Sequence, residues 1–141
     1  MLGTLKRLVT HVCTPDELDM IEHYQSRAEK LADLWVHVVG LMLAAVGGII
    51  LAGLAGVYAG IGGVMATAIY ALCLVGMLTA STIYNQTNPC AARPVLRRLD
   101  EAAIFLMIAG SYTPFTTQRF EGLWSVGFTA LIWTLAFAGA G

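Results

Sequence analysis

The chain has 141 residues, of which 57% are hydrophobic and only 12% are charged, and its formal net charge is −1. A soluble domain carries about a quarter of charged residues, so too little polar sequence remains to cover a water-soluble core. The near-neutral charge gives no reason to expect a nucleic-acid partner. No secretory signal peptide is visible, because no apolar run follows the basic residues Lys6 and Arg7.

Residues 1–31 are polar and mixed in charge, which predicts a cytoplasmic N-terminal segment ahead of the membrane domain. Thr14, Pro15 and Glu17 have the pattern of a helix start. Thr14 can cap the helix, Pro15 fits its first position, and Glu17 completes a capping box. A short capped helix is therefore expected within this segment.

Three long stretches contain no Asp, Glu, Lys or Arg: residues 34–92, 102–118 and 122–141. About 20 apolar residues are needed to cross the hydrocarbon core of a bilayer. The first stretch is long enough for two crossings and each of the others for one. The sequence thus predicts an all-α, multi-pass transmembrane helical bundle over residues 32–141. Its helices are expected at about residues 32–52, 62–84, 100–115 and 123–141.

Small residues recur along the first expected helix. Gly40, Ala44, Gly48 and Ala52 fall four apart, a spacing that lets two helix backbones approach closely in lipid. The glycine-rich residues 53–63 are expected to contain the turn to the second helix.

Pro114 lies near the end of the third expected helix. Since proline lacks an N–H donor, it is expected to bend or end that helix.

The distribution of Lys and Arg predicts the orientation, because short cytoplasmic loops are enriched in both. The N-terminal segment and residues 93–98 hold most of them, whereas the turn between the first two helices holds none. Two crossings separate the two basic segments, so both are expected on the cytoplasmic side of the cell (inner) membrane. A fourth crossing would return the C-terminus to that side.

Polar groups at membrane depth are costly and are candidates for function. Glu29, Asp33 and His37 are four apart and share one helix face. Carboxylates and an imidazole on one face suit metal binding or proton relay. Alternatively, the two carboxylates are solvated at the interface and His37 forms a hydrogen bond to a neighbouring helix.

A second polar group, Ser81, Tyr84 and Asn85, lies near the end of the second expected helix and suits either a hydrogen-bond cluster or a site lining. Asp100 opens the third helix, where the helix dipole favours an acid. It is level with Asn85, so the two side chains could meet. Ser81 and Asp100 are the candidate catalytic residues. No nucleophile elbow, phosphate loop, CxxC pair or HExxH motif occurs, so the pattern itself assigns no metal ligands.

Residues 99–104 (Leu-Asp-Glu-Ala-Ala-Ile) and 108–115 (Ile-Ala-Gly-Ser-Tyr-Thr-Pro-Phe) resemble the haemolysin III family, which belongs with the progestin and adipoQ receptors. Residues 81–85 are similar to that family's Ser-x-x-Tyr-His at the end of helix 2. Glu29, Asp33 and His37 resemble its acidic and histidine positions entering helix 1. The resemblance runs from about Glu29 to the last residue.

The resemblance implies a seven-helix bundle with a cytoplasmic N-terminus, of which the four helices here would be the first part. It also implies a zinc site near the cytoplasmic face. The family's ligands are a histidine on helix 2 and an HxxxH pair on the last helix, with the helix 3 Asp acting through water. Asp100 matches that Asp, but Asn85 stands at the first histidine position and no HxxxH pair is present. Zinc is the family's cofactor, whereas the ligands of a competent site are missing here.

Three functions follow as alternatives. The first is a haemolysin III-like membrane protein without a competent zinc site, with a role in the membrane or its homeostasis. The second is an intramembrane zinc-dependent lipid-amide hydrolase, as some members of the family are regarded, so whether the chain is an enzyme stays open. The third is a lipid or small-molecule sensor lined by Ser81, Asn85 and Asp100. The expected partners are the lipid bilayer and either further copies of the chain or other helices.

Overall fold

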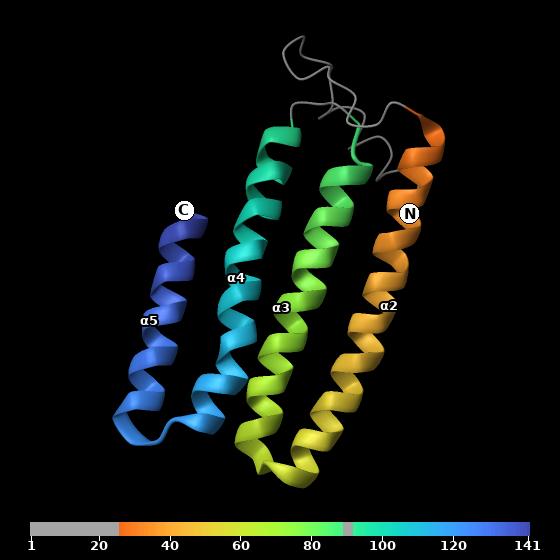
Figure 1. Cartoon of the computed structure of the whole chain (residues 1–141). Coiled ribbons are helices and arrows are strands. Elements are labelled where there is room, and N and C mark those ends of the chain that lie inside the picture. The colour runs from red at the N-terminus through yellow and green to blue at the C-terminus, as the bar shows by residue number, and fades with distance from the viewer. Residues whose placement is uncertain (1–25, 89–91) are drawn as a thin grey trace, which may run out of the picture.

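The computed structural model describes residues 26–88 and 92–141, and these residues form four α-helices with no strand among them (Figure 1). The helices are α2 (Arg27–Tyr58), α3 (Gly60–Gln86), α4 (Arg93–Arg119) and α5 (Gly122–Ala140). The predicted all-α class is confirmed. The capped helix expected at Thr14 lies outside the described residues.

The four helices stand side by side in a row, and each runs antiparallel to the next (Figure 1). Among the described helices, each packs only against its neighbours in the chain. We call the end where α4 begins the Arg93 end, and the end with the α2–α3 turn the Ala59 end. Segments 26–33, 81–88 and 93–101 all lie at the Arg93 end, so the row brings the candidate polar residues of three helices to one level.

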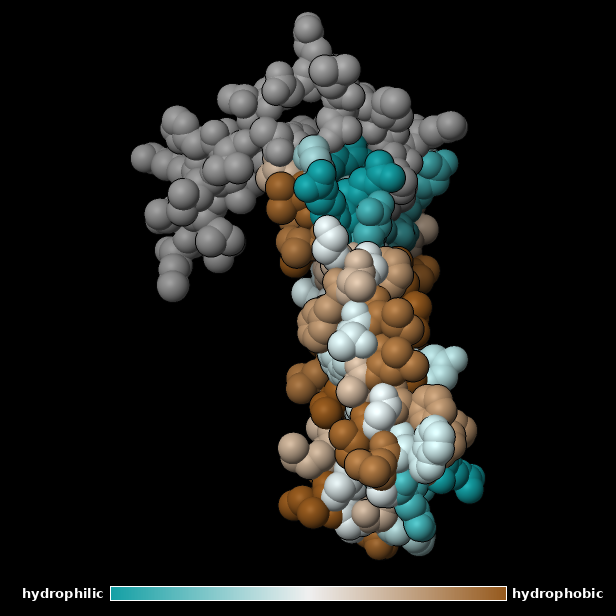
Figure 2. Space-filling model, turned by 90° about the vertical axis from the view of Figure 1, so that its left-hand side faces the viewer, coloured by the Kyte–Doolittle hydropathy of each residue, from teal (hydrophilic) through white to brown (hydrophobic). Residues whose placement is uncertain are grey.

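Three helices, α2, α3 and α5, are long and apolar enough to cross a membrane. The first turns of α4 are charged, but α4 lies between α3 and α5 along their length and therefore crosses with them. Seen from the α5 side, hydrophobic side chains cover most of the surface and hydrophilic ones gather towards the ends (Figure 2). Large apolar side chains such as Trp35, Ile49 and Leu123 are exposed, as lipid contact requires. The described chain is a multi-pass membrane protein.

The seams between helices are made of small residues. The buried hydrophobic residues of the described chain are all alanines: Ala44, Ala66, Ala109 and Ala136. A Cβ atom added at Gly48 would lie 2.9 Å from the Ala71 Cβ, and one added at Gly110 would lie 2.7 Å from the Cys73 Cβ. The helices therefore meet almost backbone to backbone. The close packing predicted for Gly40, Ala44, Gly48 and Ala52 is confirmed at Gly48, which meets Ala71 of α3, and at the buried Ala44.

A single residue, Ala59, separates α2 from α3, inside the glycine-rich stretch expected to hold the turn. Gly60 follows with a φ of +65°, a conformation that L-residues with a side chain rarely adopt. At its other end α2 begins at Arg27, where the Ser26 hydroxyl accepts a hydrogen bond from the Glu29 backbone N–H at 3.2 Å. The helix therefore extends beyond the membrane segment expected at 32–52, because an N-cap starts it in the polar region.

The third expected helix, at residues 100–115, is longer at both ends in the structure. Helix α4 begins at Arg93 with Pro94 in its first turn, where a missing N–H does no harm. It also continues beyond Pro114 to Arg119, so Pro114 does not end it. Pro114 withholds its hydrogen bond from the carbonyl of Gly110, four residues earlier. Membrane helices tolerate an internal proline because neighbouring helices hold the backbone in place, and α4 packs against both α3 and α5.

The close α2–α3 contact gives a direct test of the packing. We expect Gly48→Ala to lower the free energy of unfolding by about 1–3 kcal/mol, because its methyl group would overpack the seam at Ala71. Gly47→Ala is the matched control, since an added Cβ there meets nothing within 4 Å. Unfolding of both variants in detergent, titrated with a denaturing detergent, measures the difference. Equal stability of the two would contradict the backbone-to-backbone seam.

Candidate functional site

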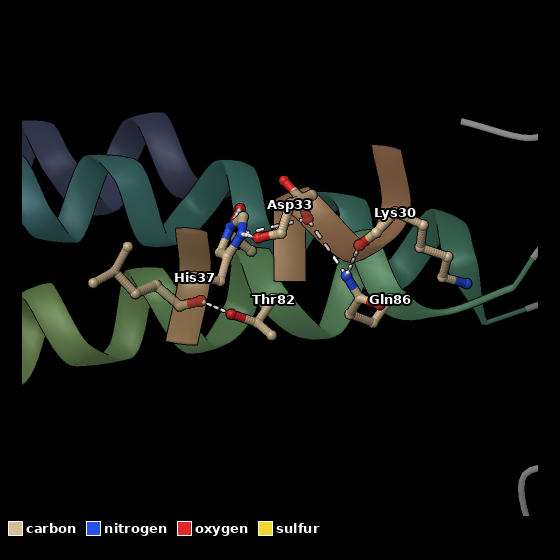
Figure 3. Close-up of polar contacts among 7 residues, drawn as sticks. Lys30, Asp33, His37, Thr82 and Gln86 are labelled. Carbon is tan, nitrogen blue, oxygen red and sulfur yellow. Dashed lines mark hydrogen bonds and ion pairs between the residues drawn. The ribbon is translucent and has the colours of Figure 1, made fainter. Parts of the chain in front are cut away.

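Polar side chains of α2 and α3 meet at the Arg93 end of their seam (Figure 3). Asp33 and His37 come from α2, while Ser81 and Gln86 come from α3, and we call these four residues the His37 cluster. All four are partly buried between the helices. The cluster joins the first predicted polar group to part of the second.

His37 lies at the centre of the cluster, and its side chain is only 12% exposed. Its Nδ1 atom is 2.9 Å from the Asp33 backbone oxygen and 3.3 Å from the Asp33 Oδ2 atom. Both of these oxygens are acceptors, so Nδ1 carries the hydrogen and donates it. In a neutral imidazole Nε2 is then an acceptor, and it takes the Ser81 hydroxyl hydrogen over 3.2 Å. This tautomer follows from the hydrogen-bond partners.

Asp33 also connects the cluster to the end of α3. The Gln86 Nε2 atom lies 3.5 Å from the Asp33 Oδ2 and 3.4 Å from the Lys30 carbonyl oxygen. These distances are long for hydrogen bonds, so each contributes little. Nearer the end, the Lys30 Nζ atom donates to the Asn88 Oδ1 at 3.0 Å. The α2–α3 seam is therefore polar over its last turns.

Ser81 differs from the threonines beside it. The Thr79 and Thr82 hydroxyls donate to carbonyls four residues earlier in α3, whereas Ser81 bonds His37 on another helix. The side chains of Asp33, His37 and Ser81 thus form a chain of contacts from an acid through a base to a hydroxyl group. Ser81 lies in the interior of α3, where backbone N–H groups already bond within the helix. Those groups are not free to stabilise an oxyanion, which acyl transfer needs.

The structure does not bring Asn85 and Asp100 together with the cluster. Both are partly buried, and neither side chain forms a hydrogen bond or ion pair with any residue in 26–88 or 92–141. Glu29 is exposed at the start of α2, where its N–H is capped by Ser26. Of the predicted site residues, the structure unites Asp33, His37 and Ser81.

Tyr84 takes part in the α3–α4 seam instead. The guanidinium of Arg93 lies over its ring, 5.6 Å from the centroid, a favourable cation–π arrangement. Arg93 is itself buried, with 7% exposure. On the outer surface of α4, Arg97 forms an exposed ion pair with Glu101 at 2.9 Å, which contributes little to stability.

Sequence reasoning missed a second polar seam, between α4 and α5. The Trp133 Nε1–H donates to the buried Thr113 hydroxyl at 3.1 Å, and the Thr116 and Thr129 hydroxyls lie 2.7 Å apart. Thr113 belongs to the Gly-Ser-Tyr-Thr-Pro run at residues 110–114, whose sequence points to the family and not to a contact between helices. The structure gives that threonine a packing role at depth in the membrane.

The described residues do not fit a zinc centre. In residues 26–88 and 92–141 no three His, Cys, Asp or Glu side chains lie close enough to hold a metal ion. A catalytic zinc site uses about three protein ligands. His37 has both ring nitrogens engaged, and Asn85 offers only a neutral amide. We therefore derive no chemical step through zinc from these residues.

The bond between His37 and Ser81 can be measured by a double-mutant cycle. We expect His37→Ala and Ser81→Ala to be coupled by about 0.6 kcal/mol, the average found for hydrogen bonds between membrane helices. Ser111→Ala is the control, because the Ser111 hydroxyl bonds Ile108 in its own helix and should show no coupling to His37. Unfolding in a denaturing detergent gives the free energies. Zero coupling between His37 and Ser81 would contradict the contact.

Two curated relatives are similar to most of this chain. The chain is 27% identical over 113 residues to "Hemolysin-3 homolog" of Bacillus subtilis (strain 168), a match that covers 79% of this chain and 52% of the relative. It is 31% identical over 111 residues to "Hemolysin-3" of Bacillus cereus, covering 79% of this chain and 51% of that protein. The chain thus spans about half the length of the curated relatives it matches. No solved structure matches it.

The matched region includes the whole described structure. Residues 25–141 match the family described as Haemolysin-III related, so the match takes in the four described helices, the His37 cluster and the polar seam between α4 and α5. The resemblance stated from residues 99–115 is confirmed. This chain belongs to the haemolysin III family.

Proposed function

We propose that this chain acts in the cell membrane as a haemolysin III-family protein without a competent zinc site in its described part. The observation that carries the proposal is that both ring nitrogens of His37 are hydrogen-bonded. Its two ring nitrogens bond Asp33 and Ser81, so the histidine joins α2 to α3 instead of offering a lone pair to a metal. Asn85 stands where the family places a ligand.

The His37 cluster supports a positioning role at the membrane surface. It fixes the register of α2 against α3 at the level where charged residues first appear on α4. A partly buried hydrogen-bonded group on one face of the row suits contact with the polar part of a lipid. This favours a role in the membrane itself, with lipid as the ligand.

The hydrolase alternative receives one supporting observation and one opposing one. The order Asp33, His37, Ser81 matches the geometry of a general base beside a hydroxyl. However, Ser81 lies inside a continuous helix whose N–H groups are engaged. Because stabilisation of the oxyanion is commonly the largest catalytic term, we rank the zinc-free membrane role above hydrolysis.

Metal analysis tests the proposal. We expect purified protein to contain far less than one zinc per chain. Asn85→His should not raise the zinc content to stoichiometric levels, because one added imidazole does not complete a set of about three ligands. Elemental analysis after dialysis measures both. One zinc per chain, lost in Asp100→Ala, would overturn the proposal and put the hydrolase first.

We further propose that the Arg93 end faces the cytoplasm. Lys30, Arg93, Arg97 and Arg98 lie at that end, whereas Arg119 is the basic residue of the described Ala59 end. Cytoplasmic loops carry the excess of Lys and Arg. The N-terminal segment would then lie in the cytoplasm, since it leads directly into α2.

Cysteine labelling in intact cells tests this orientation. With the three native cysteines replaced by Ser, Asn88→Cys and Glu121→Cys place one exposed thiol at each end of the row. We expect an impermeant maleimide to label Glu121→Cys and to reach Asn88→Cys only after the cells are opened. The reverse pattern would invert the topology.

A further inference from the structure

An apolar groove lies between α3 and α4, towards the Arg93 end. Its volume is about 490 Å³, within the size range of ligand sites. Ala80 and Ile83 of α3 face Leu99 and Ala103 of α4 across it. The one polar side chain in its lining, Thr79, donates its hydroxyl hydrogen to the Val75 carbonyl at 2.7 Å. The groove therefore offers hydrocarbon and no free polar group.

The groove and the His37–Ser81 contact lie on opposite sides of α3. Ser81 is two residues from Ile83, which places it about 200° away around the helix. The groove is thus separate from the His37–Ser81 contact. It opens on the face of the row where exposed apolar side chains meet lipid.

The length of the groove matches one leaflet. Along α4 it runs from Leu96 to Leu106, ten residues that rise by about 15 Å. The hydrocarbon core of a bilayer is about 30 Å thick, so one leaflet contributes about half of that. The groove starts among the charged turns of α4 and ends near the middle of the helix. A lipid acyl chain has this length and direction.

A positive charge stands beside the groove at its Arg93 end. Arg98 precedes the lining residue Leu99, is exposed, and forms no ion pair with another described residue. Arg97, in contrast, is paired with Glu101 on α4. The long Arg98 side chain can reach along the helix to the headgroup level. Basic residues beside grooves between membrane helices attract anionic headgroups.

We propose that this groove holds one acyl chain of an anionic phospholipid of the inner leaflet, with Arg98 at the lipid phosphate. The proposal extends the role in the membrane and rests on the proposed orientation only for the choice of leaflet. Binding to purified protein has no sidedness, so a wrong topology and a wrong lipid site give different results. The exposed Arg98 provides the charge complementarity, and the paired helices provide the apolar walls.

Native mass spectrometry of the full chain in detergent tests the headgroup. The probes are phosphatidylglycerol and phosphatidylcholine with identical acyl chains. We expect phosphatidylglycerol to bind about fivefold more tightly, the contribution of one basic residue near a membrane surface. Arg98→Gln should remove that preference while leaving phosphatidylcholine binding unchanged. Arg119→Gln, at the other end of α4, should retain it.

Filling the groove tests the acyl chain. Ala103→Phe and Thr79→Phe each place a large side chain in the groove, from opposite walls. Each should weaken the binding of both lipids by about tenfold or more, since losing contact with two methylenes already has that effect. Val126→Phe, on an exposed lipid-facing site of α5, should leave binding unchanged. Thr79 is exposed at the rim, so its variant keeps the test valid if Ala103→Phe unfolds.

Two results would overturn the proposal. If the preference for phosphatidylglycerol survives in Arg98→Gln, Arg98 does not contact the lipid phosphate. Wild-type binding of both lipids by a folded Thr79→Phe variant would show that the acyl chain lies elsewhere on the surface.

Discussion

The close approach of helix backbones is the constraint on which the rest of this structure depends. In lipid, apolar side chains gain nothing by leaving the bilayer for a helix seam, so packing contacts and hydrogen bonds must hold helices together. Here those contacts run through alanines and glycines, and no large side chain of the described residues is fully buried. At Gly48 and Gly110 even one methyl group would collide with the next helix.

Close backbones let short side chains reach across a seam. Ser81 has only one carbon between its backbone and its hydroxyl, yet it bonds His37 on α2. Thr113 accepts the Trp133 indole N–H in the same way between α4 and α5. Hydrogen bonds between membrane helices are individually modest. Their main effect here is to fix the position of one helix along the axis of its neighbour. That position sets the level of each polar side chain along the row of helices.

The sequence predicted the class of fold because charge marks membrane boundaries directly. The stretches free of charged residues gave the number of helices, and the turn at Ala59 falls among the glycines expected to hold it. The extent of α4 could not be read in this way. The apolar segment ends at the charged residues Arg93, Arg97 and Arg98. The helix itself extends through these residues into the polar region, because α4 begins at Arg93. Likewise, Pro114 marks a missing backbone hydrogen bond, but the packing of α4 against α3 and α5 lets the helix continue to Arg119.

The candidate site was only partly predictable for a related reason. Spacing along one helix placed Asp33 and His37 on one face, and they do interact. Which residue of α3 meets His37 depends on the rotation of α2 against α3. The spacing of residues along one helix does not determine that rotation. Ser81 was therefore grouped with Asn85, its neighbour on the same face, although its hydroxyl turns to His37. The Thr113–Trp133 seam was missed because both residues suit a lipid-facing helix equally well.

The row has a further consequence for how the chain assembles. Every seam among the described helices joins two that are consecutive in the sequence. Arrays in which units touch only their neighbours have stabilities close to a sum over interfaces. The α2–α3 hairpin can therefore form before α4 enters the membrane. Each later helix then packs against a helix that is already in place. A substitution that weakens one seam of the described row leaves the contacts of the other two intact.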